Sequence, residues 1–91
     1  MNHPHVILGV HVTDRLQNAM PVQALLTEYG AFIKTRLGLH EVGADGLCGT
    51  MNGLLLLEMV GGPEKARELA DRLNAIGGIE ARTMVFDHPG A

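Results

Sequence analysis

Two short stretches of the chain decide the fold: VILGVHV at residues 6–12 and LLLLEMV at residues 54–60. Both are short apolar runs that end at turn-forming residues, which is typical of β-strands. Side chains alternate between the two faces of a strand, and in both stretches apolar side chains occupy both faces. Strands of this kind are covered on both sides. We therefore expect these two stretches to be the central strands of a sheet.

A helix-like segment follows each of these strands. In the first, Asn18 is the expected N-cap, Pro21 falls in the first turn and Gly30 ends the helix. In the second, Pro63 opens the helix and Gly77 ends it. Each segment carries an apolar stripe at helical spacing. The stripes consist of Val22, Leu25, Leu26 and Tyr29, and of Ala66, Leu69, Ala70 and Leu73.

Two further strands, expected at residues 31–39 and 79–86, carry charged side chains and suit the edges of the sheet. In the first of them we expect Ile33, Leu37 and Leu39 on one face, and Lys34 and Arg36 on the other. The glycine-rich segment 41–53 is predicted to be a flexible loop. The order βαββαβ predicts an α+β fold of ferredoxin-like (ACT-like) type, a four-stranded antiparallel sheet with two helices on one face.

The composition limits the classes of function. A chain of 91 residues forms a single domain, residues 1–91, with an ordered core at about 5–87. A net charge of −3 and only three aromatic rings argue against nucleic-acid binding by this domain alone. We expect no signal peptide or membrane span. Cys48 is the single cysteine, so no intrachain disulfide is expected, and we expect a soluble cytoplasmic protein.

Self-association is the main prediction about partners. Two helices cover only one face of a sheet, yet the central strands are apolar on both faces. An exposed apolar face of several hundred Å² needs an explanation, and a second copy of the same sheet supplies one. We therefore expect a homodimer or homotetramer that assembles through the open face of the sheet.

Three groups of residues are candidates for binding or chemistry. The turn Thr13, Asp14 and Arg15 precedes a helix N-terminus, where free N–H groups favour an anion. His40 and Cys48 flank the glycine-rich segment and are chemically suited to nickel, copper or zinc, although their spacing matches no closed site. No catalytic constellation is evident, and a general base at His11 or His40 in a sheet cavity is the remaining enzymatic hypothesis.

Three segments carry a resemblance to a known family: VHVTDRLQNAMPVQALLTEYG at 10–30, KTRLGLHEV at 34–42 and DRLNAIGGIEART at 71–83. Together they resemble the iron-only hydrogenase system regulators. The shared features are an acidic-basic pair at Asp14-Arg15, the Arg-apolar-Gly-apolar segment 36–39, and a Gly-apolar turn at Gly78-Ile79. The resemblance spans residues 5–86 and implies an ACT-like fold related to the C-terminal domain of the nickel-responsive regulator.

The resemblance implies a sensing role without a complete nickel site. Only His40 and Cys48 fall near the positions of that relative's metal ligands, and its strand histidine pair is replaced here by Leu39-His40-Glu41. We expect a homo-oligomeric, non-enzymatic regulatory domain that binds a small effector or metal at a subunit interface, with no identified cofactor. The expected ligand residues are Thr13, Asp14, Arg15, Arg36, Gly38 and His40. The alternatives are a scaffold or assembly factor that acts through protein partners, and a dimeric barrel-type enzyme.

Overall fold

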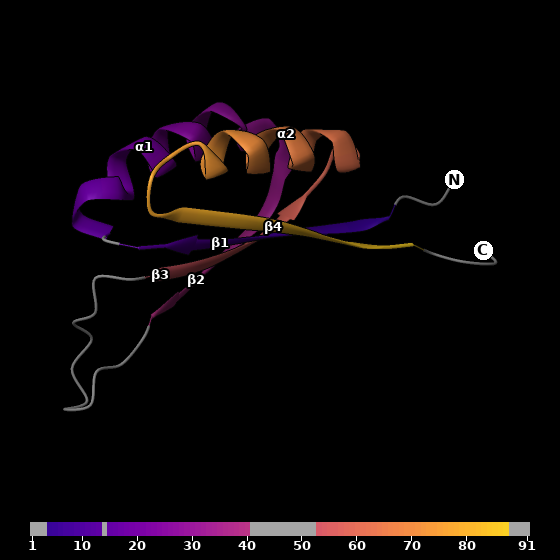
Figure 1. Ribbon diagram of the computed structural model, residues 1–91. Helices are drawn as coiled ribbons and strands as arrows, with labels where there is room; N and C mark the ends of the chain where they lie inside the picture. The colour runs from indigo at the N-terminus through magenta and orange to yellow at the C-terminus, as the bar shows by residue number, and fades with distance from the viewer. Residues whose placement is uncertain (1–3, 14, 41–52, 88–91) are drawn as a thin grey trace.

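The protein folds as a four-stranded antiparallel sheet with two helices on one face (Figure 1). This computed structural model describes residues 4–13, 15–40 and 53–87, without the side chains of residues 15–17 and 40. The strand order is β2-β3-β1-β4, which is the ferredoxin-like arrangement predicted from the sequence. The strands are β1 (His5–Val12), β2 (Ile33–His40), β3 (Gly53–Met59) and β4 (Ile79–Phe86), and the helices are α1 (Arg15–Glu28), the short 3₁₀ helix η1 (Gly30–Phe32) and α2 (Pro63–Asn74).

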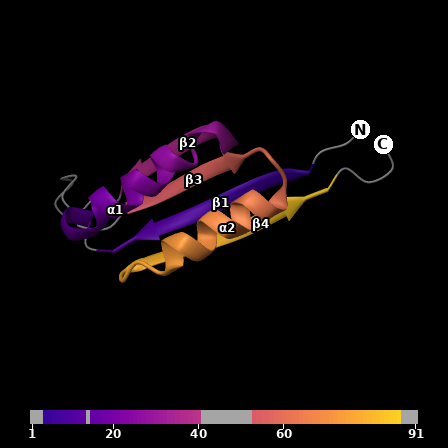
Figure 2. The ribbon, with the colours of Figure 1, turned by 90° about the horizontal axis from the view of Figure 1, so that it is seen from above.

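The core lies between the sheet and the helices. Figure 2 shows α1 over the β2–β3 half of the sheet and α2 over the β1–β4 half. The alternate residues Val6, Leu8, Val10 and Val12 of β1 are all buried against the helices, as period two requires. The predicted stripe of α2 is buried in full, and that of α1 is buried except for Leu25, which is partly buried. The two helical stripes are therefore confirmed.

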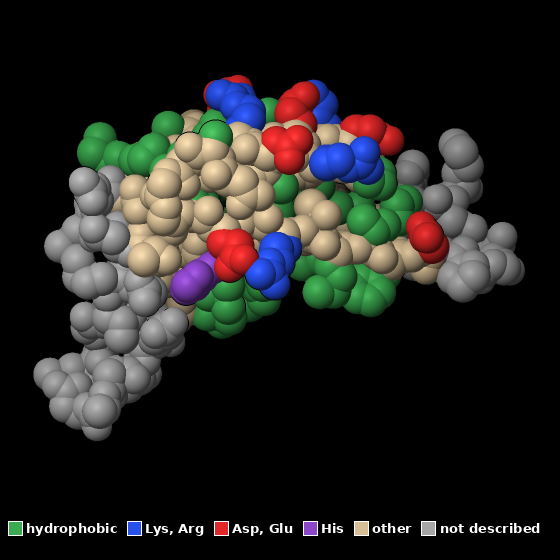
Figure 3. All heavy atoms as spheres, viewed as in Figure 1, with side chains coloured by type: hydrophobic (Ala, Val, Ile, Leu, Met, Phe, Trp, Pro, Cys, Tyr) green, Lys and Arg blue, Asp and Glu red, His purple; other side chains and the backbone are tan. Residues whose placement is uncertain are grey.

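The opposite face of the sheet, here called the open face, is not covered by either helix. The register of the strands places on it His5, Ile7, Gly9 and His11 of β1, Leu54, Leu56 and Glu58 of β3, Thr35, Leu37 and Leu39 of β2, and Glu80, Arg82, Met84 and Phe86 of β4. Large apolar side chains are exposed there, among them Leu37 at 51% and Phe86 at 53%. Hydrophobic side chains gather along the underside of the molecule in Figure 3, whereas charged side chains gather over the helices.

Helix α1 begins at Arg15, four residues earlier than an N-cap at Asn18 predicts. Asn18 lies inside the helix and is not its N-cap; its side-chain amide donates to the carbonyl oxygen of Thr13 at 2.6 Å. Pro21 is the seventh helical residue and not a first-turn residue. The helix extends upstream because Leu16, Gln17, Ala19 and Met20 are strong helix formers, which offsets the hydrogen bond that proline cannot donate.

Strand β2 contains a β-bulge that the sequence did not reveal. Its register against β3 shifts between Ile33 and Thr35, so Ile33 pairs with Met59 on the helix-covered face, whereas Leu37 pairs with Leu56 on the open face. The prediction that Ile33, Leu37 and Leu39 share one face was therefore wrong for Ile33. The extra residue of a bulge reverses the alternation beyond it.

The predicted loop at 41–53 lies outside the described residues, apart from Gly53, the first residue of β3. No helix in the described ranges has the length and apolar character that crossing a membrane requires.

Candidate ligand-binding site

A cavity of about 210 Å³ lies between α1 and the edge of the sheet formed by β2 and β3. We call it the α1–β2 cavity. Its lining includes Ala19, Val22 and Gln23 from α1, Arg36 and Gly38 from β2, and Leu55 from β3. Typical pockets for drug-sized ligands have volumes of roughly 300–1,000 Å³. The α1–β2 cavity therefore suits a small anion, or one charged group of a larger ligand.

The bulge in β2 directs Arg36 toward this cavity. Arg36 pairs with Leu57, whose side chain is fully buried beneath the helices, so Arg36 lies on the helix-covered face. Its Nη2 donates to the side-chain oxygen of Gln23 on α1 at 2.8 Å. Within the described part of the chain, no carboxylate pairs with this guanidinium. A planar guanidinium has five N–H donors, so most of its donors are available for a carboxylate or phosphate group.

Gly38 keeps the cavity open. It pairs with Leu55 and faces the helices, two residues beyond Arg36 on the same side of β2. A Cβ placed at Gly38 would meet Cδ2 of Leu55 at 3.5 Å, which is ordinary contact. A larger side chain would extend further into the space between β2 and α1. The glycine therefore contributes volume, and the arginine contributes charge.

The structure brings some of the predicted ligand residues together. Arg36 and Gly38 line the α1–β2 cavity, and Val12, the neighbour of Thr13, also lines it. Thr13 itself is exposed, and its peptide groups are already bonded: its N–H donates to the carbonyl oxygen of Gly78 at 2.8 Å, and its carbonyl accepts from Asn18. Asp14 lies outside the described residues, as do the side chains of Arg15 and His40.

The metal hypothesis stays a prediction. Cys48 and the side chain of His40 fall outside what the structure describes. Among the residues that it does describe, no group of three or more histidine, cysteine, aspartate or glutamate side chains could hold a metal ion.

Sequence reasoning missed the contribution of α1 to the cavity. Ala19 and Gln23 are four residues apart on one side of the helix, opposite β2. Their spacing is a usable signal, but a small residue and an amide form no recognisable motif. Only the packing of α1 against β2 shows that Gln23 orients Arg36.

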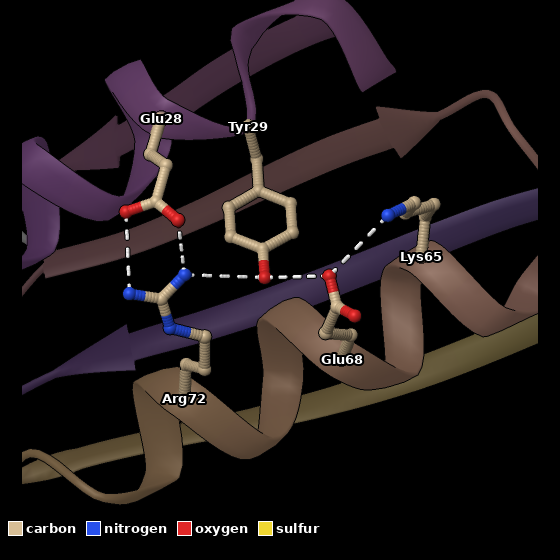
Figure 4. Close-up of polar contacts among 5 residues, drawn as sticks. All are labelled: Glu28, Tyr29, Lys65, Glu68 and Arg72. Atoms are coloured by element: carbon tan, nitrogen blue, oxygen red, sulfur yellow. Dashed lines mark hydrogen bonds and ion pairs between the residues drawn. The ribbon is translucent and has the colours of Figure 1, made fainter.

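A second polar cluster joins α1 and the residue after it to α2 (Figure 4). Arg72 of α2 forms an ion pair with Glu28 at the end of α1, and its guanidinium lies 5.5 Å from the ring centre of Tyr29. The Tyr29 hydroxyl donates to Glu68 at 2.7 Å, and Lys65 pairs with the same carboxylate at 3.5 Å.

These contacts shift the ionisation of both carboxyl groups. The hydrogen bond from Arg72 lowers the pKa of Glu28, and the hydrogen bond from Tyr29 lowers the pKa of Glu68. The hydrogen bond to Glu28 raises the pKa of Arg72. Each of the carboxylates is held in its charged form by its partners and serves to fasten α1 to α2. The cluster therefore joins the two helices through charged and polar side chains.

Comparison with known proteins identifies the fold and no sequence family. No protein-family model and no curated protein sequence matches the chain. An uncharacterized protein from Thermotoga maritima superposes with a TM-score of 0.73 at 20% identity, over 93% of this chain and 98% of that one. At this identity the similarity shows the fold alone.

Two PII-like proteins share the same fold. A nitrogen regulatory PII-like protein from Thiomonas intermedia, solved bound to ADP, AMP and bicarbonate, superposes with a TM-score of 0.57 at 14% identity, over 97% of this chain and 96% of that one. A PII-like signaling protein from Thermus thermophilus superposes with a TM-score of 0.58 at 15% identity, over 96% of this chain and 90% of that one. The ferredoxin-like fold is thus confirmed, and the resemblance to hydrogenase system regulators stays a prediction.

Proposed function

We propose that this chain is a homo-oligomeric regulatory domain that senses a small anionic effector in the α1–β2 cavity. The observation that carries the proposal is the guanidinium of Arg36, positioned by Gln23 at a concave site and unpaired with any described carboxylate. Charge-assisted hydrogen bonds between arginine and a carboxylate or phosphate are strong and geometrically selective. Bicarbonate and the phosphate groups of AMP and ADP, which a PII-like protein of the same fold binds, belong to this class of ligand.

The proposal assigns the domain to binding and not to catalysis. Arg36 is the single titratable side chain in the described lining of the cavity, and arginine does not lose its proton in proteins. A general base would have to come from elsewhere. The family resemblance implies a role in a hydrogenase-type metalloenzyme system. In that role the domain would signal the presence of the bound effector to a partner protein.

The test is calorimetric titration of the purified protein with AMP, ADP, sodium bicarbonate and inorganic phosphate, with adenosine as the uncharged control. Losing one charge-assisted contact costs about 1.5–3 kcal/mol, so Arg36→Gln should weaken binding by roughly 10- to 150-fold. Arg67→Gln is the matched control, because Arg67 is an exposed arginine on α2, away from the cavity. Gly38→Val should abolish binding by filling the cavity.

Two results would contradict the proposal. One is binding of these anions with equal affinity to the parent protein and to Arg36→Gln. The other is absence of binding for all four anions together with no shift in melting temperature, since a ligand that prefers the folded state must raise it. In the second case the scaffold function becomes the better candidate, because the exposed apolar side chains of the open face would then be the main feature to explain.

A further inference from the structure

The open face has a pattern of four corners. Apolar side chains occupy two opposite corners, and charged side chains occupy the other two. The cross-strand register and the ion pairs define them: a leucine corner of Leu37, Leu39, Leu54 and Leu56, a methionine corner of Ile7, Met84 and Phe86, a Glu80 corner of His11, Glu80 and Arg82, and a Glu58 corner of His5, Lys34, Thr35 and Glu58.

The charged corners contain paired groups of both signs. Arg82 bonds to Glu80 in the first. In the second, Nζ of Lys34 lies 3.9 Å from Glu58, and the Thr35 hydroxyl donates to Glu58 at 3.3 Å. Each corner therefore pairs an acidic side chain with a basic one.

The two diagonals of the face differ in chemistry. One diagonal runs from the leucine corner to the methionine corner through Leu39, Leu56, Ile7 and Phe86, and is entirely apolar. The other runs from Glu80 through Gly9 to Glu58, and both of its side chains are acidic. This difference decides how two copies of the face can meet.

A two-fold axis that joins two copies face to face must lie in the plane between the sheets. If the axis ran parallel to the strands, Leu37 would lie against the partner's Arg82, and Leu39 against the partner's Glu80. If it ran perpendicular to the strands, Leu56 would lie against the partner's Glu58. Both arrangements press charged groups onto apolar ones, which is unfavourable unless the charges find other partners.

The two-fold axes that remain are those along the two diagonals of the face. The axis along the acidic diagonal is unfavourable. An axis along it would place Glu58 against the partner's Glu58, and Glu80 against the partner's Glu80. An axis along the apolar diagonal instead places leucine against leucine and exchanges the two charged corners. Glu58 then faces the partner's Arg82, and Lys34 faces the partner's Glu80, so opposite charges meet.

We propose that a second copy of this chain covers the open face, with the two sheets crossed about a two-fold axis that runs along Leu39, Leu56, Ile7 and Phe86. This inference rests on the self-association in the proposed function and adds its geometry. It is an orthogonal and not an aligned packing of sheets. Four strands of about eight residues present roughly 500 Å² per copy, so two copies bury about 1,000 Å², the lower limit for a specific interface.

A hollow on the open face fits this arrangement. A depression of about 200 Å³ lies over Gly9, bordered by His11, Leu54, Glu80 and Arg82. A Cβ at Gly9 would meet no atom closer than 3.9 Å, so the missing side chain leaves real space. The proposed axis brings the partner's Glu58 over this hollow, next to the guanidinium of Arg82.

Native mass spectrometry and light scattering of the full chain test whether the face is covered. We expect a dimer for the parent protein. Leu56→Glu places an unpaired charge on the axis and should weaken the dimer by at least roughly 100-fold. Leu37→Glu, at a more exposed position, should act in the same direction and guards against a folding defect in the first variant. Met20→Glu is the matched control, because Met20 is 83% exposed on α1, away from the face.

Thiol cross-linking tests the axis, in a Cys48→Ser background so that the introduced cysteine is the only one. Packed sheets lie about 10 Å apart, so a cross-linker of about 8 Å should join Leu39→Cys to its own copy. It should not join Glu80→Cys to its own copy, since crossing separates those positions by more than about 20 Å.

The outcomes separate this proposal from the proposed function. A monomeric parent protein, a trimer, or a dimer that cross-links through position 80 and not through position 39 would overturn the crossed two-fold geometry. Anion binding that depends on Arg36 could persist in each of these cases, because Arg36 lies on the opposite face of the sheet. Conversely, a dimer that cross-links through Leu39→Cys but binds no anion would refute the sensing function and support the proposed interface.

Discussion

The side chain of Asn74, the last residue of α2, is bonded to the outer edge of the sheet. Its Nδ2 donates to the carbonyl oxygen of Ala81 at 3.0 Å, and its Oδ1 accepts from the N–H of Ala81 at 2.8 Å. Because β4 is an edge strand, these peptide groups point away from β1 and would otherwise have no strand to pair with. The amide of Asn74 thus acts as a one-residue substitute for a neighbouring strand.

Replacing Asn74 by alanine removes both hydrogen bonds. Each is worth about 0.5–1.5 kcal/mol net, so we expect Asn74→Ala to lower the free energy of unfolding by about 2 kcal/mol. For a domain of this size that corresponds to a fall of roughly 8–16 °C in melting temperature. Thermal and urea unfolding followed by circular dichroism, at one fixed protein concentration, measure the effect. A fixed concentration matters because self-association makes the melting temperature depend on it.

Two further variants sharpen this prediction. Arg67→Ala changes an exposed α2 position and should alter stability by less than about 0.5 kcal/mol. Asn74→Asp keeps the acceptor for the N–H of Ala81 but places a carboxylate oxygen against its carbonyl oxygen, so it should also be less stable than the parent protein. If Asn74→Ala and Arg67→Ala have the same free energy of unfolding, the hydrogen bonds between Asn74 and Ala81 contribute nothing to stability, and the reasoning is refuted.

Three other predictions concern stability. Gly78→Ala should lower the free energy of unfolding, measured in urea, by about 1–2 kcal/mol. Gly78 has a φ of +85°, and an added Cβ would lie 2.7 Å from Nδ2 of Asn18. Gly77→Ala is the neutral control, because a Cβ at Gly77 would meet open space. Leu69→Ala, at a fully buried site, should cost about 2–5 kcal/mol; equal stability of variant and parent would contradict the assignment of the core. Stability should fall as the pH drops below the ordinary glutamate pKa of 4.5 toward the lowered pKa values of Glu28 and Glu68, because carboxylates with depressed pKa values stabilise the fold only while ionised. Melting curves from pH 7 to pH 3 should show a weaker acid dependence in Glu28→Gln/Glu68→Gln, and an unchanged slope would count against these ion pairs.

Much of the fold was predictable because the spacing of apolar residues along a strand or helix follows which of its faces are buried. The apolar side chains on both faces of β1 and β3 placed those strands in the centre of the sheet, and the stripe of α2 fixed its buried side. The start of α1 was not predictable in the same way. Asn18 and Pro21 together look like the first turn of a helix, and the competing helix propensity upstream carries no comparable local signal.

The candidate site was only half predictable for a related reason. Arg36 and Gly38 were found through a short motif, but their partner Gln23 belongs to a distant helix and is ordinary in type. Such a contact depends on how α1 packs over β2, and that packing is decided by the whole core. The predicted roles of Asp14, His40 and Cys48 stay predictions.

The bulge at Lys34 and Thr35 links the two proposals. Ile33 and Thr35 pair with Met59 and Glu58, which are neighbours in β3, so Lys34 is one extra residue in β2 and the alternation beyond it is reversed. If the same residues continued from Ile33 as a regular strand without the bulge, Arg36 would point to the open face, and Leu37 and Leu39 would point toward the helices. The anion site would lose its cation, and the apolar diagonal would lose its leucine end. A single irregularity in an edge strand therefore assigns charge to one face of the sheet and apolar surface to the other, and the ligand site and the interface depend on it equally.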